Sequence, residues 1–150
     1  MHHHGPKLMI LLSAWFVFAG FAAFGWAAVE HTEMAIASKQ TKGVTIALTN
    51  AEGRLREHEN GFCVVFEQSG TEEPLIVRKV GVEFRLLVGR IQENPISAHL
   101  TESKPGRYCG QVNLGKQYYN PAVYYAFVSY TDPIGRKRRT RFFVSVKHSR

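Results

Sequence analysis

The pattern of hydrophobic and polar positions divides the chain near Glu30. Residues 8–29 form a run of 22 residues without a charged side chain. A helix of about 20 apolar residues crosses the hydrocarbon core of a bilayer, so this run predicts a transmembrane anchor. A cleaved signal peptide, whose apolar core is shorter at about 7–15 residues, is the alternative. The expected organisation is a short tail at 1–7, the anchor at 8–29, a polar linker at 30–42 and one folded domain at 43–150.

From Gly43 onward the pattern changes to short strands separated by turn residues. Phe62, Val64 and Phe66 alternate with residues of the opposite face, which is the period of two expected of a strand. Gly81 interrupts a longer run and is expected to mark a bulge or a bend. The runs of this kind are 44–48, 62–67, 75–88, 96–100, 107–114, 123–131 and 140–147.

These runs follow one another closely within residues 43–150, and no long apolar repeat of 3.6 residues accompanies them. The fold class predicted is therefore all-β: an immunoglobulin-like antiparallel β-sandwich of about seven strands, preceded by one transmembrane helix. A small β-barrel would have the same composition and is the alternative.

The net charge of +7 adds to this picture because the charges are unevenly placed. After Asp132 the chain has seven Lys and Arg residues and no acidic residue. Such a patch favours an acidic protein surface, phosphate or acidic lipid, and a solvated hairpin without a ligand is the alternative. The cations considered as partner-binding residues are Arg136, Lys137, Arg138, Arg139 and Arg141.

Tyr118 and Tyr119 stand in a loop that ends at Pro121, where their rings are expected to be exposed. Exposed tyrosines next to a basic hairpin predict a protein-binding surface, because aromatic residues and arginine are enriched where proteins bind tightly. The same residue types also bind single-stranded nucleic acid. A domain outside the cytoplasm rarely meets nucleic acid, so we expect a protein partner and no nucleic acid.

Cys63 and Cys109 lie on two runs that are expected to pair. Their spacing matches neither a C-x-x-C redox motif nor a zinc finger. In an oxidising compartment they are expected to form a disulfide. Two unbridged thiols, or a copper or redox site built from them, are the alternatives, and no other cofactor is expected.

Several strand motifs between Gly53 and Val146 match those of a known family. They are a Gly-x-Leu at Gly53, Asn60-Gly-Phe62-x-Val64-x-Phe66, Val80-x-Val82-x-Phe84, Gly106-Arg107-Tyr108-x-Gly110-x-Val112 and a last strand pair joined at Gly135. In these motifs the chain resembles the FixH-like/YtkA-like β-sandwich family, in which an N-terminal membrane anchor is common. The resemblance implies an extracytoplasmic module tied to metal handling or to respiratory-oxidase assembly.

The methionines separate this chain from the copper-handling relatives of that family. Several relatives have methionines in or after the central strand, where thioethers suit Cu(I). Here Met1, Met9 and Met34 all precede the expected domain. The family's copper role is therefore not carried over to any residue of this chain.

The sequence has no nucleophile elbow, zinc-protease motif or phosphate-binding loop, so we expect no enzyme and no small-molecule substrate. The function predicted is that of a single-pass protein of the cell (inner) membrane. Its periplasmic or otherwise extracytoplasmic domain would bind a partner protein or membrane complex. A copper-binding or redox domain using Cys63 and Cys109, and a structural envelope protein, are the alternatives.

Overall fold

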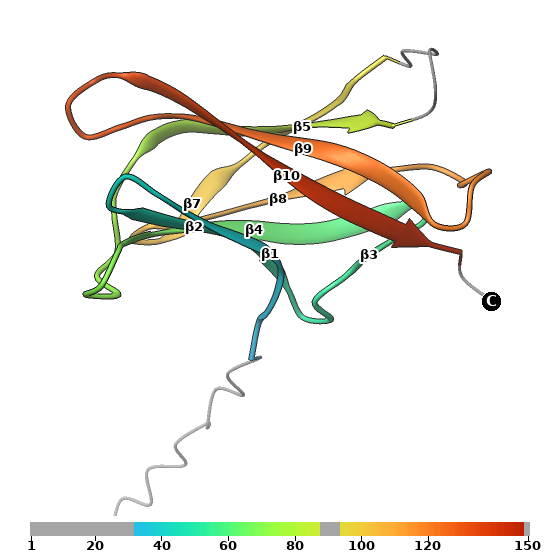
Figure 1. Ribbon diagram of the computed structural model, residues 1–150, viewed down its shortest axis with the longest axis horizontal. Coiled ribbons are helices and arrows are strands. Elements are labelled where there is room, and N and C mark those ends of the chain that lie inside the picture. The colour runs from blue at the N-terminus through green and yellow to red at the C-terminus, as the bar shows by residue number, and fades with distance from the viewer. Residues whose placement is uncertain (1–31, 88–93, 149–150) are drawn as a thin grey trace, which may run out of the picture. The chain divides into compact units, whose positions relative to one another are not determined.

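A computed structural model describes residues 32–87 and 94–148, which form two facing β-sheets (Figure 1). This arrangement confirms the predicted all-β sandwich. The first sheet consists, in spatial order, of β1 (Met34–Thr41), β2 (Val44–Asn50), β4 (Glu59–Gln68), β8 (Arg107–Asn113) and β7 (Thr101–Lys104). The second sheet consists of β3 (Leu55–Arg56), β10 (Lys137–Lys147), β9 (Ala122–Thr131), β5 (Arg78–Leu86) and β6 (Ile96–His99).

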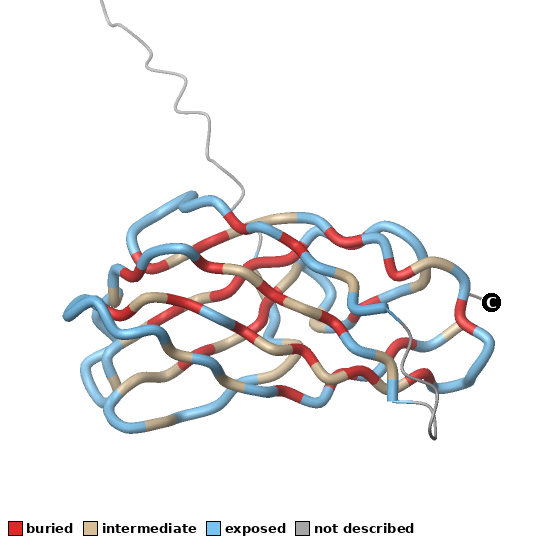
Figure 2. Tube along the Cα trace, turned by 90° about the horizontal axis from the view of Figure 1, so that it is seen from above, coloured by how far each residue is buried: buried red, intermediate tan, exposed pale blue. Residues whose placement is uncertain are grey.

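Alternation along the strands builds the core between the two sheets. Phe62, Val64 and Phe66 of β4 are buried on one side, and Val82 and Phe84 of β5 are buried opposite. The rings of Phe62 and Phe84 meet edge to face with their centroids 5.6 Å apart. Figure 2 shows how buried and exposed positions alternate along the strands. The period of two in the sequence therefore grouped correctly the residues of β4 that share one face, and the structure shows that this face is buried.

The described residues contain ten strands, whereas about seven were expected. The largest addition is β1, which occupies most of the segment expected to be a linker at 30–42. Thr41 pairs with Val44, so Lys42 and Gly43 form a two-residue turn with φ angles of +39° and +81°. Positive φ at both positions is typical of the type I′ turn that joins tight hairpins. The linker prediction was therefore wrong over β1, and the folded domain begins before Gly43.

The strand order is that of an immunoglobulin-like sandwich. The order β2-β4-β8-β7 corresponds to strands A, B, E and D of that fold, and β10-β9-β5-β6 corresponds to G, F, C and C′. Tyr124, near the start of β9, donates its hydroxyl hydrogen to Oε1 of Gln117 at 2.9 Å. The tyrosine corner of immunoglobulin domains has a tyrosine at this position, whose hydroxyl also bonds to a preceding residue, there to the backbone. Ala126 is fully buried where immunoglobulin domains place the second cysteine of their inter-sheet disulfide.

A buried pair of hydrogen bonds ties the first sheet to the chain that leads into β5. The Tyr108 hydroxyl donates to the carbonyl of Val77 at 2.6 Å and accepts from the N–H of Val77 at 2.9 Å. Burial raises the pKa of the Tyr108 phenol above its ordinary value, and the bond to Val77 opposes that effect. Tyr108 therefore connects elements that pack from opposite sides of the core.

The predicted anchor at 8–29 lies outside the described residues. Within residues 32–87 and 94–148, no helix is both long and apolar enough to cross a membrane. The sandwich belongs to a structural unit that begins at His31.

Candidate functional site

Three aromatic side chains are in contact on the outward face of the second sheet. Alternation turns Tyr125 and Phe127 of β9, and Phe143 of β10, away from the core. Tyr125 and Phe143 are paired in register, and their ring centroids lie 4.8 Å apart. The centroids of Tyr125 and Phe127 lie 5.8 Å apart. Phe143 is 60% exposed, so a large part of its apolar ring faces solvent.

Two arginines of β10 stack on these rings. The guanidinium carbon of Arg139 lies 4.1 Å from the centroid of Phe127. That of Arg141 lies 4.8 Å from the centroid of Tyr125 and 5.4 Å from that of Phe143. A cation–π contact at an exposed site contributes about 0.5–1 kcal/mol, so the rings help to hold both guanidinium groups in place.

Two residues of β5 complete this surface. Arg85 lies over the ring of Phe127 at 5.6 Å, and its Nε pairs with the carboxylate of Glu83. The same carboxylate lies 3.5 Å from a terminal nitrogen of Arg139. One carboxylate among three guanidinium groups leaves the surface cationic. The aromatic–arginine face is defined here as Arg85, Tyr125, Phe127, Arg139, Arg141 and Phe143.

The basic turn between β9 and β10 is organised by Asp132. Its Oδ1 accepts hydrogen bonds from the N–H groups of Ile134 and Arg136, at 3.1 and 2.8 Å, and its Oδ2 accepts from Arg138 Nε at 2.9 Å. Desolvation alone would raise the pKa of Asp132, but these hydrogen bonds and the Arg138 charge lower it below its ordinary value. Arg138 therefore supports the turn itself, whereas Arg136 and Lys137 are exposed.

Tyr118 and Tyr119 lie at the other end of the domain from the basic turn. They are 85% and 48% exposed, as expected of a loop. Their loop precedes β9 and the basic turn follows it, so the ten residues of β9, at about 3.3 Å each, separate the two. Figure 1 shows the two loops at opposite ends of the sandwich. The expectation that these tyrosines lie next to the basic hairpin was therefore wrong.

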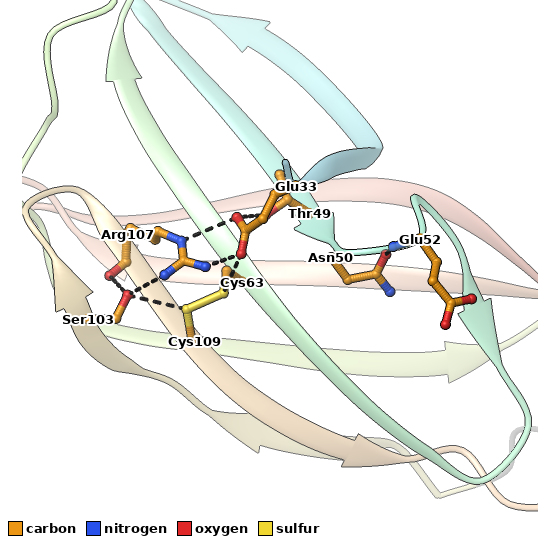
Figure 3. A network of polar contacts seen from close by, with 8 residues as sticks. All are labelled: Glu33, Thr49, Asn50, Glu52, Cys63, Ser103, Arg107 and Cys109. Atoms are coloured by element: carbon orange, nitrogen blue, oxygen red, sulfur yellow. Dashed lines mark hydrogen bonds and ion pairs between the residues drawn. A yellow bond between two sulfur atoms is a disulfide. The ribbon is translucent and has the colours of Figure 1, made fainter. Parts of the chain in front are cut away.

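Cys63 and Cys109 form a disulfide, as predicted. They are directly opposite in register on β4 and β8, with their Cα atoms 4.0 Å apart. The bridge therefore joins neighbouring strands of the first sheet, on the side away from the core (Figure 3). With both sulfur atoms in this bond, neither is a thiolate ligand for copper. Within residues 32–87 and 94–148, no three His, Cys, Asp or Glu side chains converge on a metal site.

Polar side chains cover this disulfide (Figure 3). Arg107 Nε donates to Glu33 Oε2 at 3.2 Å, and the Thr49 hydroxyl donates to the same oxygen at 2.9 Å. The Ser103 hydroxyl lies 3.3 Å from Cys109 Sγ. The Arg107 guanidinium beside Glu33 lowers the pKa of that carboxyl below its ordinary value, outweighing the effect of burial. The cluster fastens the chain just before β1 onto the first sheet.

The sequence identified only part of the aromatic–arginine face. Arg139 and Arg141 were candidates because they belong to the basic turn and the strand after it. Alternation in the sequence groups Tyr125 with Phe127 on the first strand of this hairpin and Phe143 with Ser145 on the second, but it leaves open whether these two sets or the opposite register face one another. Register decides this, because a shift of one residue would turn the opposite set of side chains outward. The members not identified as site residues are Arg85, Tyr125, Phe127 and Phe143.

The strand order and the outward faces define a small immunoglobulin-like β-sandwich domain. No family model matches the chain, and no curated protein matches it either. Among solved structures, the chain is similar to murine CRIg, with 11% sequence identity and a TM-score of 0.40. The match covers 65% of this chain and 92% of that chain. A likeness at this level concerns the fold alone.

Proposed function

We propose that this chain is a non-enzymatic binding protein whose sandwich contacts a partner protein through the aromatic–arginine face. The observation that carries the proposal is the position of Phe143. Its ring is 60% exposed, packs on Tyr125 and lies beside the guanidinium group of Arg141. Aromatic residues and arginine are enriched among the residues whose loss weakens protein interfaces most, and aromatic rings bury large areas with few rotatable bonds.

The face is suited to binding because its side chains are already held in the free domain. Its residues stand on paired strands, and the stacking of Arg139 and Arg141 on the rings restricts their rotamers. Immobilising a flexible side chain on binding costs about 0.5–1.5 kcal/mol, so an ordered face loses less free energy than a set of unrestrained arginines would.

The charge of the face indicates the chemistry of the partner. Three arginines surround the rings, and Glu83 neutralises one of them at most. Opposite charges across an interface speed association and exclude wrong partners. We therefore expect a partner surface with an apolar depression for the Phe143 ring and carboxylates around it.

The compartment and the identity of the partner belong to the same proposal. The disulfide supports an oxidising, extracytoplasmic location, since such bonds are rare in the cytosol. The apolar run at 8–29 supports a single-pass anchor in the cell membrane. The resemblance to the FixH-like/YtkA-like family makes a membrane complex, such as a respiratory oxidase or a metal-transport system, the partner that we propose.

The test is co-purification of the full-length chain from its native membranes with Phe143→Ser. We expect the bound complex to be lost with only a small decrease in melting temperature, because Phe143 is outside the core and loses only its contacts across the sheet surface. The matched control is Ile76→Ser, which removes another exposed apolar side chain, 57% exposed and outside the face. Retention of the same complex by the Phe143 variant, or equal loss from the control, would exclude this face as the binding surface.

A further inference from the structure

A basic groove lies at the open edge of the sandwich, between the β1–β2 hairpin and the first half of β10. Its volume is about 540 Å³. β3 pairs with β10 only at Val146 and Lys147, so among the described strands none is hydrogen-bonded to the first half of β10 on that edge. Figure 1 shows the β1–β2 and β9–β10 hairpins at the same end of the domain. The cationic residues lining the groove are Lys39, Lys42, Arg138, Arg139 and Arg141.

The charge of this groove is poorly compensated. None of the residues that line it is acidic. Two of the five cations have a carboxylate partner nearby, Asp132 for Arg138 and Glu83 for Arg139. Five like charges around one hollow raise the local potential, and a bound anion would relieve their repulsion. The cations without an acidic partner among the described residues are Lys39, Lys42 and Arg141.

The groove also offers the donors that an oxyanion needs. Thr41 and Thr140 place hydroxyl groups among the cations. Arg141 is held over two rings, and a guanidinium group matches the oxygens of phosphate in bidentate fashion. Binding pockets for small ligands have volumes of about 300–1,000 Å³, so this groove is large enough for more than a single phosphate ion.

We propose that this basic groove binds a phosphate-bearing anion, supplied either by a free phosphorylated compound or by the headgroup of an anionic lipid. The competing explanation is that lysines on edge strands only prevent those edges from pairing with other chains. The proposal goes beyond the protein-binding function, since Lys39 and Lys42 are not part of the aromatic–arginine face.

The test uses the purified full-length chain in neutral detergent micelles at low ionic strength, with tripolyphosphate as the probe in a calorimetric titration. We expect saturable binding that weakens with added salt, because salt screens charges at the surface. Lys39→Gln with Lys42→Gln should weaken it about thirtyfold, as expected when two cations near an anion are removed. The melting temperature should not change, because neither lysine pairs with an acidic residue among the described residues.

The matched control removes two exposed cations far from the groove, through Lys116→Gln with Lys147→Gln. It should bind tripolyphosphate as the unmodified chain does. The absence of binding to the unmodified chain, or equal weakening in both double variants, would overturn the proposal and leave edge protection as the role of the lysines. The Lys39 and Lys42 double variant should still co-purify with the partner complex, because neither lysine belongs to the aromatic–arginine face, so failure of the protein-binding proposal and failure of the phosphate proposal are recognised separately.

A second arm distinguishes the two sources of phosphate. The titration is repeated in micelles that contain phosphatidylglycerol, and again with phosphatidylcholine in its place. If a lipid headgroup occupies the groove, phosphatidylglycerol should compete with tripolyphosphate, and this competition should be reduced in the Lys39 and Lys42 double variant. If the ligand is a free phosphorylated compound, tripolyphosphate should bind equally well with either lipid.

Discussion

Glu33, the residue before β1, is ion-paired with Arg107 at the first position of β8, 74 residues further along the chain. The pair lies over the Cys63–Cys109 bridge and is joined by the hydroxyl of Thr49 (Figure 3). Both side chains are about three-quarters covered, with 24% of Glu33 and 28% of Arg107 exposed. The pair therefore links the beginning of the folded domain to the middle of the first sheet.

Replacing Glu33 with Gln should lower the free energy of unfolding by about 1–2 kcal/mol, because Arg107 loses a partly buried charged partner. Urea unfolding followed by circular dichroism measures this change. Glu52→Gln is the control, since Glu52 pairs with Arg54 and Arg56 in the open and should contribute about 0–1 kcal/mol. Equal effects of the two substitutions would show that the Glu33–Arg107 pair stabilises the fold no more than the exposed pairs of Glu52 do.

The stability of the domain should decrease in acid, in part through Glu33. Its pKa is lowered from an ordinary value of 4.5, so the folded state holds this proton less tightly than the unfolded state does. The stabilisation is then fully present above about pH 4.5 and is lost as the pH falls through the lower folded value. Asp132 acts in the same direction from its ordinary value of 3.8.

The Glu33→Gln variant gives this dependence a direct control. The difference in unfolding free energy between the unmodified chain and this variant should shrink as the pH is lowered from about 6 to about 3. Protonation and the substitution both remove the negative charge of the Glu33 carboxylate. Urea titrations across this range provide the measurement. A difference that stays constant with pH would mean that Glu33 does not stabilise the fold through its charge.

Reduction of the Cys63–Cys109 bridge should lower the free energy of unfolding by about 3–4 kcal/mol in the chain-entropy model, because the bridge closes a long segment of the unfolded chain. Intact mass after alkylation reports the redox state, and urea unfolding with and without reductant gives the free-energy change. A Cys63→Ser, Cys109→Ser double variant should resemble the reduced protein and should not respond to reductant. An unmodified chain that alkylates fully without reductant would contradict the pairing.

Two consecutive phenylalanines of β10 should behave in opposite ways. Phe142 is 4% exposed and faces the core, so Phe142→Ala should destabilise the domain by about 3–5 kcal/mol. Phe143 is 60% exposed and loses only its contacts across the sheet surface, so Phe143→Ala should cost about 0.2–1 kcal/mol. Thermal and urea unfolding of both variants would check this contrast, and comparable losses would mean that β10 has a different register.

The Tyr108 hydroxyl should stabilise the fold through its two bonds to Val77. Tyr108→Phe leaves a buried N–H and a buried carbonyl without this partner, which should cost about 1–3 kcal/mol. Tyr119→Phe, at a half-exposed loop position, is the matched control and should have little effect. A Tyr108 variant as stable as the control would indicate that water replaces the hydroxyl.

The parts of the fold that could be predicted are those with a local signal. Alternation and turn residues located seven strands, and Gly81 does stand at an irregularity of register between β5 and β9. β1 was missed because its polar residues resemble those of a linker. It is a strand because it pairs with β2, and this pairing has no signal within the segment itself. β3 has only 2 residues, and the four residues of β7 are all polar and exposed, so neither strand shows an alternation of apolar and polar positions.

The candidate site depended on longer-range information than the sequence provides. The pairing of Cys63 with Cys109 was predictable because only two cysteines exist and both strands were recognised. The aromatic–arginine face needed the register of β9 with β10 and of β9 with β5, which no local pattern contains. Tyr118 was wrongly expected next to the basic turn because residues close in sequence at the two ends of a long strand are far apart in space.

The position of the disulfide has a mechanical consequence. β1 belongs to the first sheet and β10 to the second. Tension between the two ends of the domain would therefore pull the two sheets apart, and no disulfide among the described residues joins one sheet to the other. The bridge would not resist separation of the sheets, but it would keep the chain between Cys63 and Cys109, which are 46 positions apart in sequence, from extending. At about 3.5 Å per extended residue, a single stretched domain would lengthen by roughly 160 Å less than its reduced form.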